Sequence, residues 1–202
     1  MKDSLYILLF FVSGIIVGVW HIIPQEVGDI LMTYALYLML LLAGMCMGFD
    51  TRNFLIFRTY GLRILLLPLG SIIGTALGCL LAYMILLGIG QYLSLRDVLG
   101  VGAGFGYYSL SSAMITKLGN AELGSVALIA NISRELLTLL FAPIMVRYAG
   151  GLAPVAAGGA TTMDTCMPVI ARHAGEEYAI MGIFSGMVLS MVVPILVTAI
   201  FA

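Results

Sequence analysis

Long stretches without any charged side chain are the feature that most constrains the fold of this chain. Charges are absent over five windows, which are residues 4–20, 30–49, 64–95, 98–116 and 178–202. Most of these windows reach or exceed the roughly 20 residues that an α-helix needs to cross the hydrocarbon core of a bilayer. Of the 202 residues, 9% are charged and 62% are hydrophobic, against roughly 25% charged residues in a typical soluble domain. The sequence therefore predicts an all-α, multi-pass membrane protein and excludes a soluble one.

The charge balance and the cysteines exclude several kinds of partner. Nine basic and ten acidic side chains leave a net charge of −1, so no basic surface is available to neutralise the phosphates of a nucleic acid. The three cysteines have neither CxxC nor Cys/His spacing, which argues against a zinc site or a disulfide framework. We therefore expect no metal, no cofactor and no nucleic acid. The expected partners are the lipid bilayer, other membrane segments and small solutes.

Two further segments are long enough to cross a bilayer but are interrupted by ionisable residues. Residues 123–148 contain the adjacent pair Arg134 and Glu135, and residues 152–172 contain Asp164 among Gly, Thr and Pro. A charged side chain at the centre of a bilayer costs about 2.5–3.5 kcal/mol on insertion scales, so these side chains must face protein or water. We expect the functional site in these segments.

The chain is thus expected to contain about seven transmembrane segments, and their composition changes after about residue 90. The change predicts a three-helix scaffold domain at residues 1–90 and a site-bearing transport domain with interrupted helices at residues 91–202. Two segments, residues 98–116 and 152–172, are expected to be broken or re-entrant. The distribution of Lys and Arg does not decide whether these two span or re-enter. In both arrangements it places the N-terminus in the cytoplasm and the C-terminus outside.

The first candidate site segment is glycine-rich and is followed by hydroxyl groups. Glycines at positions 102, 104 and 106 weaken a helix and permit an unwound stretch. The hydroxyl groups after it could bind a polar solute, and they belong to Tyr107, Tyr108, Ser109 and Ser111. The alternative interpretation is a tight helix crossing with interfacial tyrosines.

The second candidate segment contains Asn131, Arg134 and Glu135 in an otherwise apolar helix. Adjacent helix positions project about 100° apart, so Arg134 and Glu135 are expected to reach different partners, while Asn131 shares their face. Glu135 could bind an ammonium group, and Arg134 could attract a substrate carboxylate or clamp Asp164. The alternative is a structural ion-pair network that locks helices together.

The third candidate segment places one carboxylate between helix-breaking residues. Gly158, Gly159 and Pro168 bracket Asp164, and the hydroxyl groups of Thr161 and Thr162 lie beside it. This composition is suited to a discontinuous helix that exposes backbone groups around a carboxylate. Asp164 is the first candidate for the essential residue, because a carboxylate in a low-dielectric cavity can carry a proton at one stage and hold a cation at another. The alternative is an aspartate that caps a helix and faces water.

The order and spacing of these segments resemble the lysine exporter family called LysO. The blocks that carry the resemblance are Gly104–Ser111, Gly124–Ser125, Arg134–Leu136, Gly159–Asp164 and Val193–Leu196. The similarity runs from about residue 30 to the end and corresponds to the carboxyl-terminal portion of longer members. It implies a secondary transporter, not an enzyme, that exports L-lysine and cationic analogues across the bacterial inner membrane by proton antiport. A channel-like or structural subunit of a split transporter, or a transporter of another small cationic solute, are the alternatives.

The chain departs from the family in two respects. Members carry an acidic residue at the position of Asn131, and longer members have additional amino-terminal helices that resemble residues 1–90. An odd number of spans before a second copy would invert it, and inverted repeats place a substrate site at their interface. The resemblance therefore implies an inverted-repeat architecture, completed by a separately encoded small three-helix membrane partner or by a homodimer.

Overall fold

The computed structural model describes residues 61–90, 93–118 and 120–201, together with scattered positions between 13 and 45. The chain divides into two compact units, residues 1–43 and 44–202. The predicted segments at residues 4–20 and 30–49 fall largely outside the described residues. All candidate site residues belong to the second unit.

Helices account for all regular secondary structure in the described residues, which confirms the predicted all-α class. Three helices, α4 (Leu66–Gly88), α7 (Ala121–Ala149) and α10 (Glu176–Phe201), are long and apolar enough to cross a membrane. The short element η1 (Gly61–Leu65) precedes α4, and the short elements between the long helices are α5 (Leu95–Gly102), α6 (Tyr108–Leu118), α8 (Ala153–Gly158), η2 (Gly159–Met163) and α9 (Met167–His173).

Capping residues explain where α5 and α7 begin and where α7 ends. Ser94 and Asp97 form a capping box at the start of α5, in which Asp97 N donates to Ser94 Oγ at 3.1 Å and Ser94 N donates to Asp97 Oδ2 at 3.3 Å. Asn120 Oδ1 accepts a hydrogen bond from Leu123 N at 2.6 Å at the start of α7, and Gly150, with φ +85°, follows its last turn. These contacts satisfy backbone groups that a helix end leaves without intrahelical partners.

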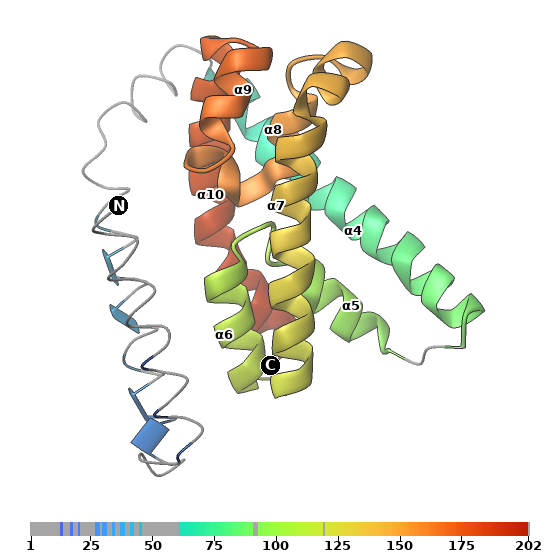
Figure 1. The fold of residues 1–202 in the computed structure, drawn as a ribbon, viewed down its shortest axis with the longest axis vertical. Coiled ribbons are helices and arrows are strands. Elements are labelled where there is room, and N and C mark those ends of the chain that lie inside the picture. Colours follow the sequence, from blue (N-terminus) through green and yellow to red (C-terminus); the bar gives the residue numbers. More distant parts are fainter. Residues whose placement is uncertain are drawn as a thin grey trace. The chain divides into compact units, whose positions relative to one another are not determined.

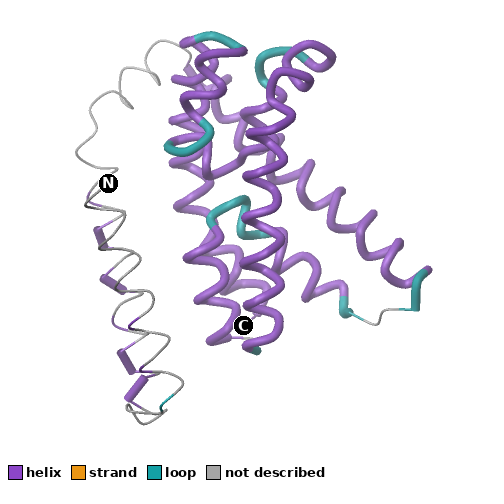
Figure 2. Tube along the Cα trace, viewed as in Figure 1, coloured by secondary structure: helices purple, strands orange, loops and turns teal. Residues whose placement is uncertain are grey.

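Residues 98–116 and 152–172 each lie in a part of the chain that turns back instead of running through the unit. Figure 1 shows α5 and α6 in its lower half and α8 and α9 in its upper half, whereas α7 and α10 run through both halves. Figure 2 shows the loop between α5 and α6 in the middle of the unit. Residues 98–116 and 152–172 therefore belong to two hairpins that enter from opposite ends. In the described unit each segment therefore forms short helices joined by a turn and is not one continuous helix.

The tips of the two hairpins meet through their backbones. The first tip reverses at Phe105 and Gly106, with φ of +45° and +92°, and the second reverses at Gly159, with φ of +65°. Ala160 N donates a hydrogen bond to Phe105 O at 2.8 Å. Positive φ values favour glycine, so the glycines that predict breaks in the sequence lie at the turns themselves.

Helix α10 is the most buried of the three long helices and supports the second tip. In the most apolar 18-residue stretch of α10, 44% of the residues are buried, whereas in that of α4 only 6% are buried. Its Gly182 and Gly186 permit close approach of η2, because a Cβ atom on Gly186 would lie 2.8 Å from Ala160 O. Thr162 Oγ1 lies 2.7 Å from Gly182 O and hydrogen-bonds to it. Small residues at a helix contact let the backbones come together in this way.

Gly159→Ala should destabilise the protein much more than Gly150→Ala. Both glycines have positive φ, which costs an L-residue roughly 1–2 kcal/mol. A Cβ atom on Gly159 would in addition collide with Phe105 O, whereas a Cβ atom on Gly150 would meet nothing within 4 Å. Thermal unfolding in detergent, followed by circular dichroism, should give a clearly lower midpoint for Gly159→Ala. Equal midpoints would contradict the observed meeting of the tips.

Candidate functional site

A cavity of about 140 Å³ lies where the hairpin tips meet α7. Its walls come from the first tip and the start of α6, from α7, and from the second hairpin. The lining residues are Gly106, Tyr107, Tyr108, Ser109, Glu135, Ala160, Thr161, Met163, Asp164 and Thr165. Six of the ten residues predicted from the sequence therefore line one cavity, although they come from three separate segments of the chain.

The charged groups of this cavity are two carboxylates. Asp164 Oδ1 accepts hydrogen bonds from Thr165 N at 2.6 Å and from Thr165 Oγ1 at 3.3 Å. Glu135 is half-buried and has no hydrogen-bond or ion-pair partner among the residues that the structure describes. No Lys or Arg lines the cavity. Because carboxylates form strong charge-assisted hydrogen bonds with ammonium groups, the cavity is suited to a cation.

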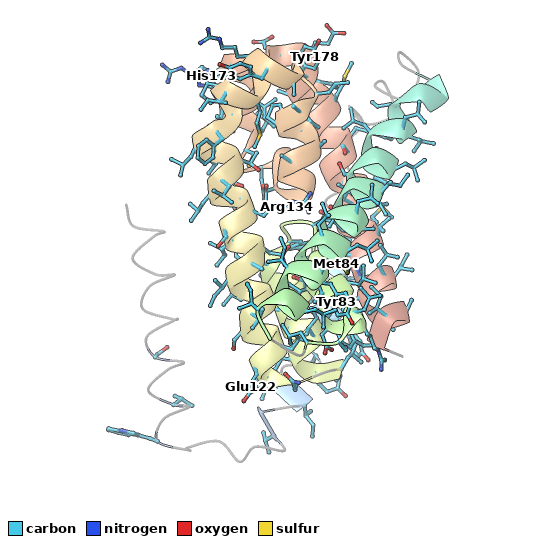
Figure 3. The ribbon with its side chains drawn as sticks, turned by 90° about the vertical axis from the view of Figure 1, so that its right-hand side faces the viewer. Tyr83, Met84, Glu122, Arg134, His173 and Tyr178 are labelled. Carbon is cyan, nitrogen blue, oxygen red and sulfur yellow. The ribbon has the colours of Figure 1, made fainter. Side chains whose placement is uncertain are left out.

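Glu135 lies away from the ends of the unit and is half-buried, whereas Asp164 is exposed. Figure 3 shows Arg134 between Glu122, near one end, and His173 and Tyr178, near the other. Glu135 is the next residue of α7. Asp164 follows η2, and the residue that precedes α9 as its N-cap is Cys166. Asp164 is therefore not the N-cap residue of α9.

Asn131 is buried and forms three hydrogen bonds, two of them to the first hairpin and one to its own helix. Its Oδ1 accepts from Gly106 N at 2.7 Å, and its Nδ2 donates to Val101 O at 3.1 Å and to Ala127 O at 2.9 Å. An amide is required for this set, because a carboxylate has no N–H to donate. Asn131 therefore joins α7 to both sides of the first tip and does not line the cavity.

Arg134 and Glu135 reach different surroundings. Arg134 lines a larger cavity of about 780 Å³ between α4 and the hairpins, with Ala156 and Ala157 of α8 in its wall. Its Nε donates to Ala157 O at 2.7 Å and its Nη2 donates to Ala156 O at 3.2 Å. Its Nη1 donates to Thr75 Oγ1 of α4 at 3.0 Å. Within the described residues the guanidinium therefore binds backbone carbonyls and a hydroxyl group, and it forms no ion pair with Asp164.

The remaining two predicted residues are buried beside the cavity. Thr162 Oγ1 lies 2.7 Å from the carbonyl oxygens of both Gly159 and Gly182, and Ser111 Oγ lies 3.5 Å from Tyr108 O. Neither lines the cavity. Sequence reasoning missed Thr165, although it directly follows Asp164 and its hydroxyl group could have been included on that ground. The described residues contain no group of three His, Cys, Asp or Glu side chains that could hold a metal ion.

Asn131→Leu should destabilise the fold by about 1–3 kcal/mol, the cost of leaving a buried polar group without its partner. The substitution leaves Gly106 N without its acceptor at the first tip. Ser125→Ala on the same helix is the matched control, because Ser125 is exposed and, among the described residues, bonds only to Ala121 O of its own helix. Thermal unfolding in detergent should separate the two variants, and a loss no larger than that of the control would contradict the role of Asn131 at the tip.

Comparison with known proteins identifies the family. A family model described as the lysine exporter LysO matches residues 8–201. The lysine exporter LysO of Escherichia coli (strain K12) is 34% identical over 105 residues, which are 52% of this chain and 35% of that protein. A putative lysine exporter of Haemophilus influenzae is 35% identical over 98 residues, which are 48% of this chain and 50% of that protein. The chain thus aligns with about a third to a half of the length of these relatives, and no solved structure matches it significantly. Because the family model spans nearly all of the sequence, this chain belongs to the lysine exporter LysO family.

Proposed function

We propose that this chain is the site-bearing part of a secondary transporter that exports L-lysine and close cationic analogues across the bacterial inner membrane. Membership of the exporter family and the three long apolar helices support a membrane transporter. The observation that carries the cationic substrate is the cavity in which Glu135 and Asp164 have no cationic partner among the described residues. Lysine carries two ammonium groups and a net positive charge, which two carboxylates can bind.

The lining of the cavity suggests a role for each group. Asp164 binds either an ammonium group or a proton, and Glu135 binds the second ammonium group. The amino-acid head group is held by the hydroxyl groups that line the same cavity, those of Tyr107, Tyr108, Ser109 and Thr161. The other four residues predicted from the sequence shape the tips and do not touch the substrate, and they are Asn131, Arg134, Ser111 and Thr162.

Proton antiport gives this export a driving force. Moving one positive charge outward against a negative-inside potential costs about 2.3 kcal/mol per 100 mV. Exchange of one inward proton for each outward lysine cancels that electrical cost and leaves the pH and lysine gradients to drive the cycle. A carboxylate that binds one species at a time is sufficient for such an exchange.

We further propose that additional helices complete the transporter. Helix α4 is the least buried of the long helices, and a cavity of about 780 Å³ is lined by α4, α5, α7 and α8. A separately encoded three-helix membrane chain, or a second copy of this one, would cover it and supply the other half of an inverted repeat. In this arrangement residues 1–90 act as the scaffold and residues 91–202 carry the site, with the N-terminus in the cytoplasm and the C-terminus outside.

Inverted membrane vesicles that contain the protein should take up labelled lysine only when a proton gradient is imposed. Asp164→Asn should abolish this uptake, and Glu135→Gln should weaken it strongly, because each removes a negative charge from the cavity. Uptake that is independent of the pH gradient would indicate a channel. Competition by arginine and ornithine would show how far the substrate range extends.

Glu122→Gln is the matched control for the two carboxylate variants. Glu122 lies on the same helix as Glu135 but is exposed in the first turn of α7, so its loss should leave uptake unchanged. Normal export by Asp164→Asn would exclude Asp164 as the coupling group. If Asp164→Asn and Glu135→Gln together left uptake intact, the chain would be a structural subunit.

Purification should show the transporting form as larger than a single chain. Mass measurement in detergent, with and without a co-expressed short membrane partner, would distinguish a complex of two different chains from a homodimer. A monomer that transports lysine after reconstitution would contradict the proposed completion by further helices.

A further inference from the structure

Two hydroxyl groups of α4 contact one end of α8 and the Arg134 side chain that binds that end. Ser71 Oγ donates a hydrogen bond to Ala156 O at 3.3 Å, and Thr75 Oγ1 accepts one from Arg134 Nη1 at 3.0 Å. Arg134 also binds the carbonyl oxygens of Ala156 and Ala157. We call these five residues the α4–α8 joint. Ser71 and Thr75 lie one helical turn apart, so the same face of α4 supplies both contacts.

The joint supplies hydrogen-bond donors to carbonyl groups at the end of α8, in a mostly apolar environment. The last carbonyl groups of a helix have no intrahelical partner and carry a partial negative charge, which a cation at that end complements. Much of the surrounding wall is small and apolar, as at Gly74, Gly78 and Ala82. A hydrogen bond is electrostatically stronger in such an environment than in water. Arg134 is thereby held at membrane depth by carbonyl oxygens.

The joint is directly connected to the proposed lysine site. Helix α8 continues into η2, and η2 ends at Asp164. On the other side, the guanidinium carbon of Arg134 lies 5.9 Å from the centre of the Phe105 ring in the first tip. Arg134 therefore touches elements of both hairpins while its charge stays outside the cavity that Glu135 lines.

We propose that Arg134 is a positioning residue for the lysine site, and this inference rests on the proposed function. The α4–α8 joint fixes the end of α8 against α4, and the position of α8 determines where Asp164 stands in the cavity. Arg134 acts through α8 and does not bind the substrate carboxylate. Thr75 shares this role, because it holds the guanidinium from α4.

Two variants and one matched control separate positioning from substrate binding. Thr75→Val removes the acceptor on α4 with little change of shape, and Arg134→Lys keeps the charge but loses the forked geometry. Ser133→Ala is the control, because Ser133 lines the same larger cavity but has no hydrogen-bond partner among the described residues. None of these residues lines the cavity that contains Asp164.

The first measurement compares lysine with cadaverine, its decarboxylated analogue, as competitors of labelled lysine uptake in inverted vesicles. Thr75→Val and Arg134→Lys should weaken both competitors by the same factor, about two- to tenfold, as expected for the loss of one hydrogen bond. Ser133→Ala should weaken neither. If Arg134→Lys weakened lysine alone, Arg134 would bind the substrate carboxylate and the proposal would be overturned.

The second measurement does not depend on lysine transport. Asp164→Cys is introduced into a chain whose three native cysteines are replaced by alanine, and its labelling by a cationic thiol reagent is timed. Adding Thr75→Val or Arg134→Lys should change the labelling rate by about threefold or more, a free-energy change of about 0.7 kcal/mol, and adding Ser133→Ala should not. Unchanged rates in both variants would overturn the proposal. A wild-type protein that transports no lysine would instead contradict the proposed function, and labelling would still test the joint.

Discussion

Every backbone N–H and C=O group at membrane depth needs a partner, and the two hairpin tips cannot provide all of these partners from within their own helices. The first tip obtains them from Asn131, which binds Gly106 N and a carbonyl group of α5. The second tip contributes Ala160 N to Phe105 O, and Arg134 binds the last carbonyl groups of α8. The meeting of the tips, and hence the cavity between them, depends on these contacts.

One turn of α7 thus has two separate tasks. Asn131 and Arg134 close the tips by binding backbone groups, whereas Glu135 faces the small cavity. Arg134 and Glu135 do not neutralise each other, because adjacent helix positions point in different directions. The positive charge is balanced by the partial charges of carbonyl groups, whereas the negative charge has no cationic partner among the described residues.

The sequence predicts the residues that line the cavity better than it predicts the contacts that hold the hairpins in place. Glycine patterns locate both helix breaks, and Asp164 together with most of the predicted hydroxyl residues beside the breaks lines the cavity. The turning back of the hairpins could not be predicted, because the balance of Lys and Arg is the same in both topologies. The contacts of Ser71 and Thr75 were also missed, since a hydroxyl group in an apolar helix does not indicate which group of another helix it will contact. Helical spacing predicts a shared face for Asn131, but it does not identify the tip as the partner.

The uncompensated charge of the cavity also offers a reason for exchange rather than leakage. Two carboxylates of like charge line one cavity, and neither has a cationic partner among the described residues, so the unoccupied cavity carries a cost of electrostatic repulsion. Binding of lysine to Asp164 and Glu135, or of a proton to one of them, lowers that cost. On the proposed function, the transporter would therefore change conformation with either ligand bound more readily than with neither. On the same proposal, this preference would couple the exit of a lysine to the entry of a proton.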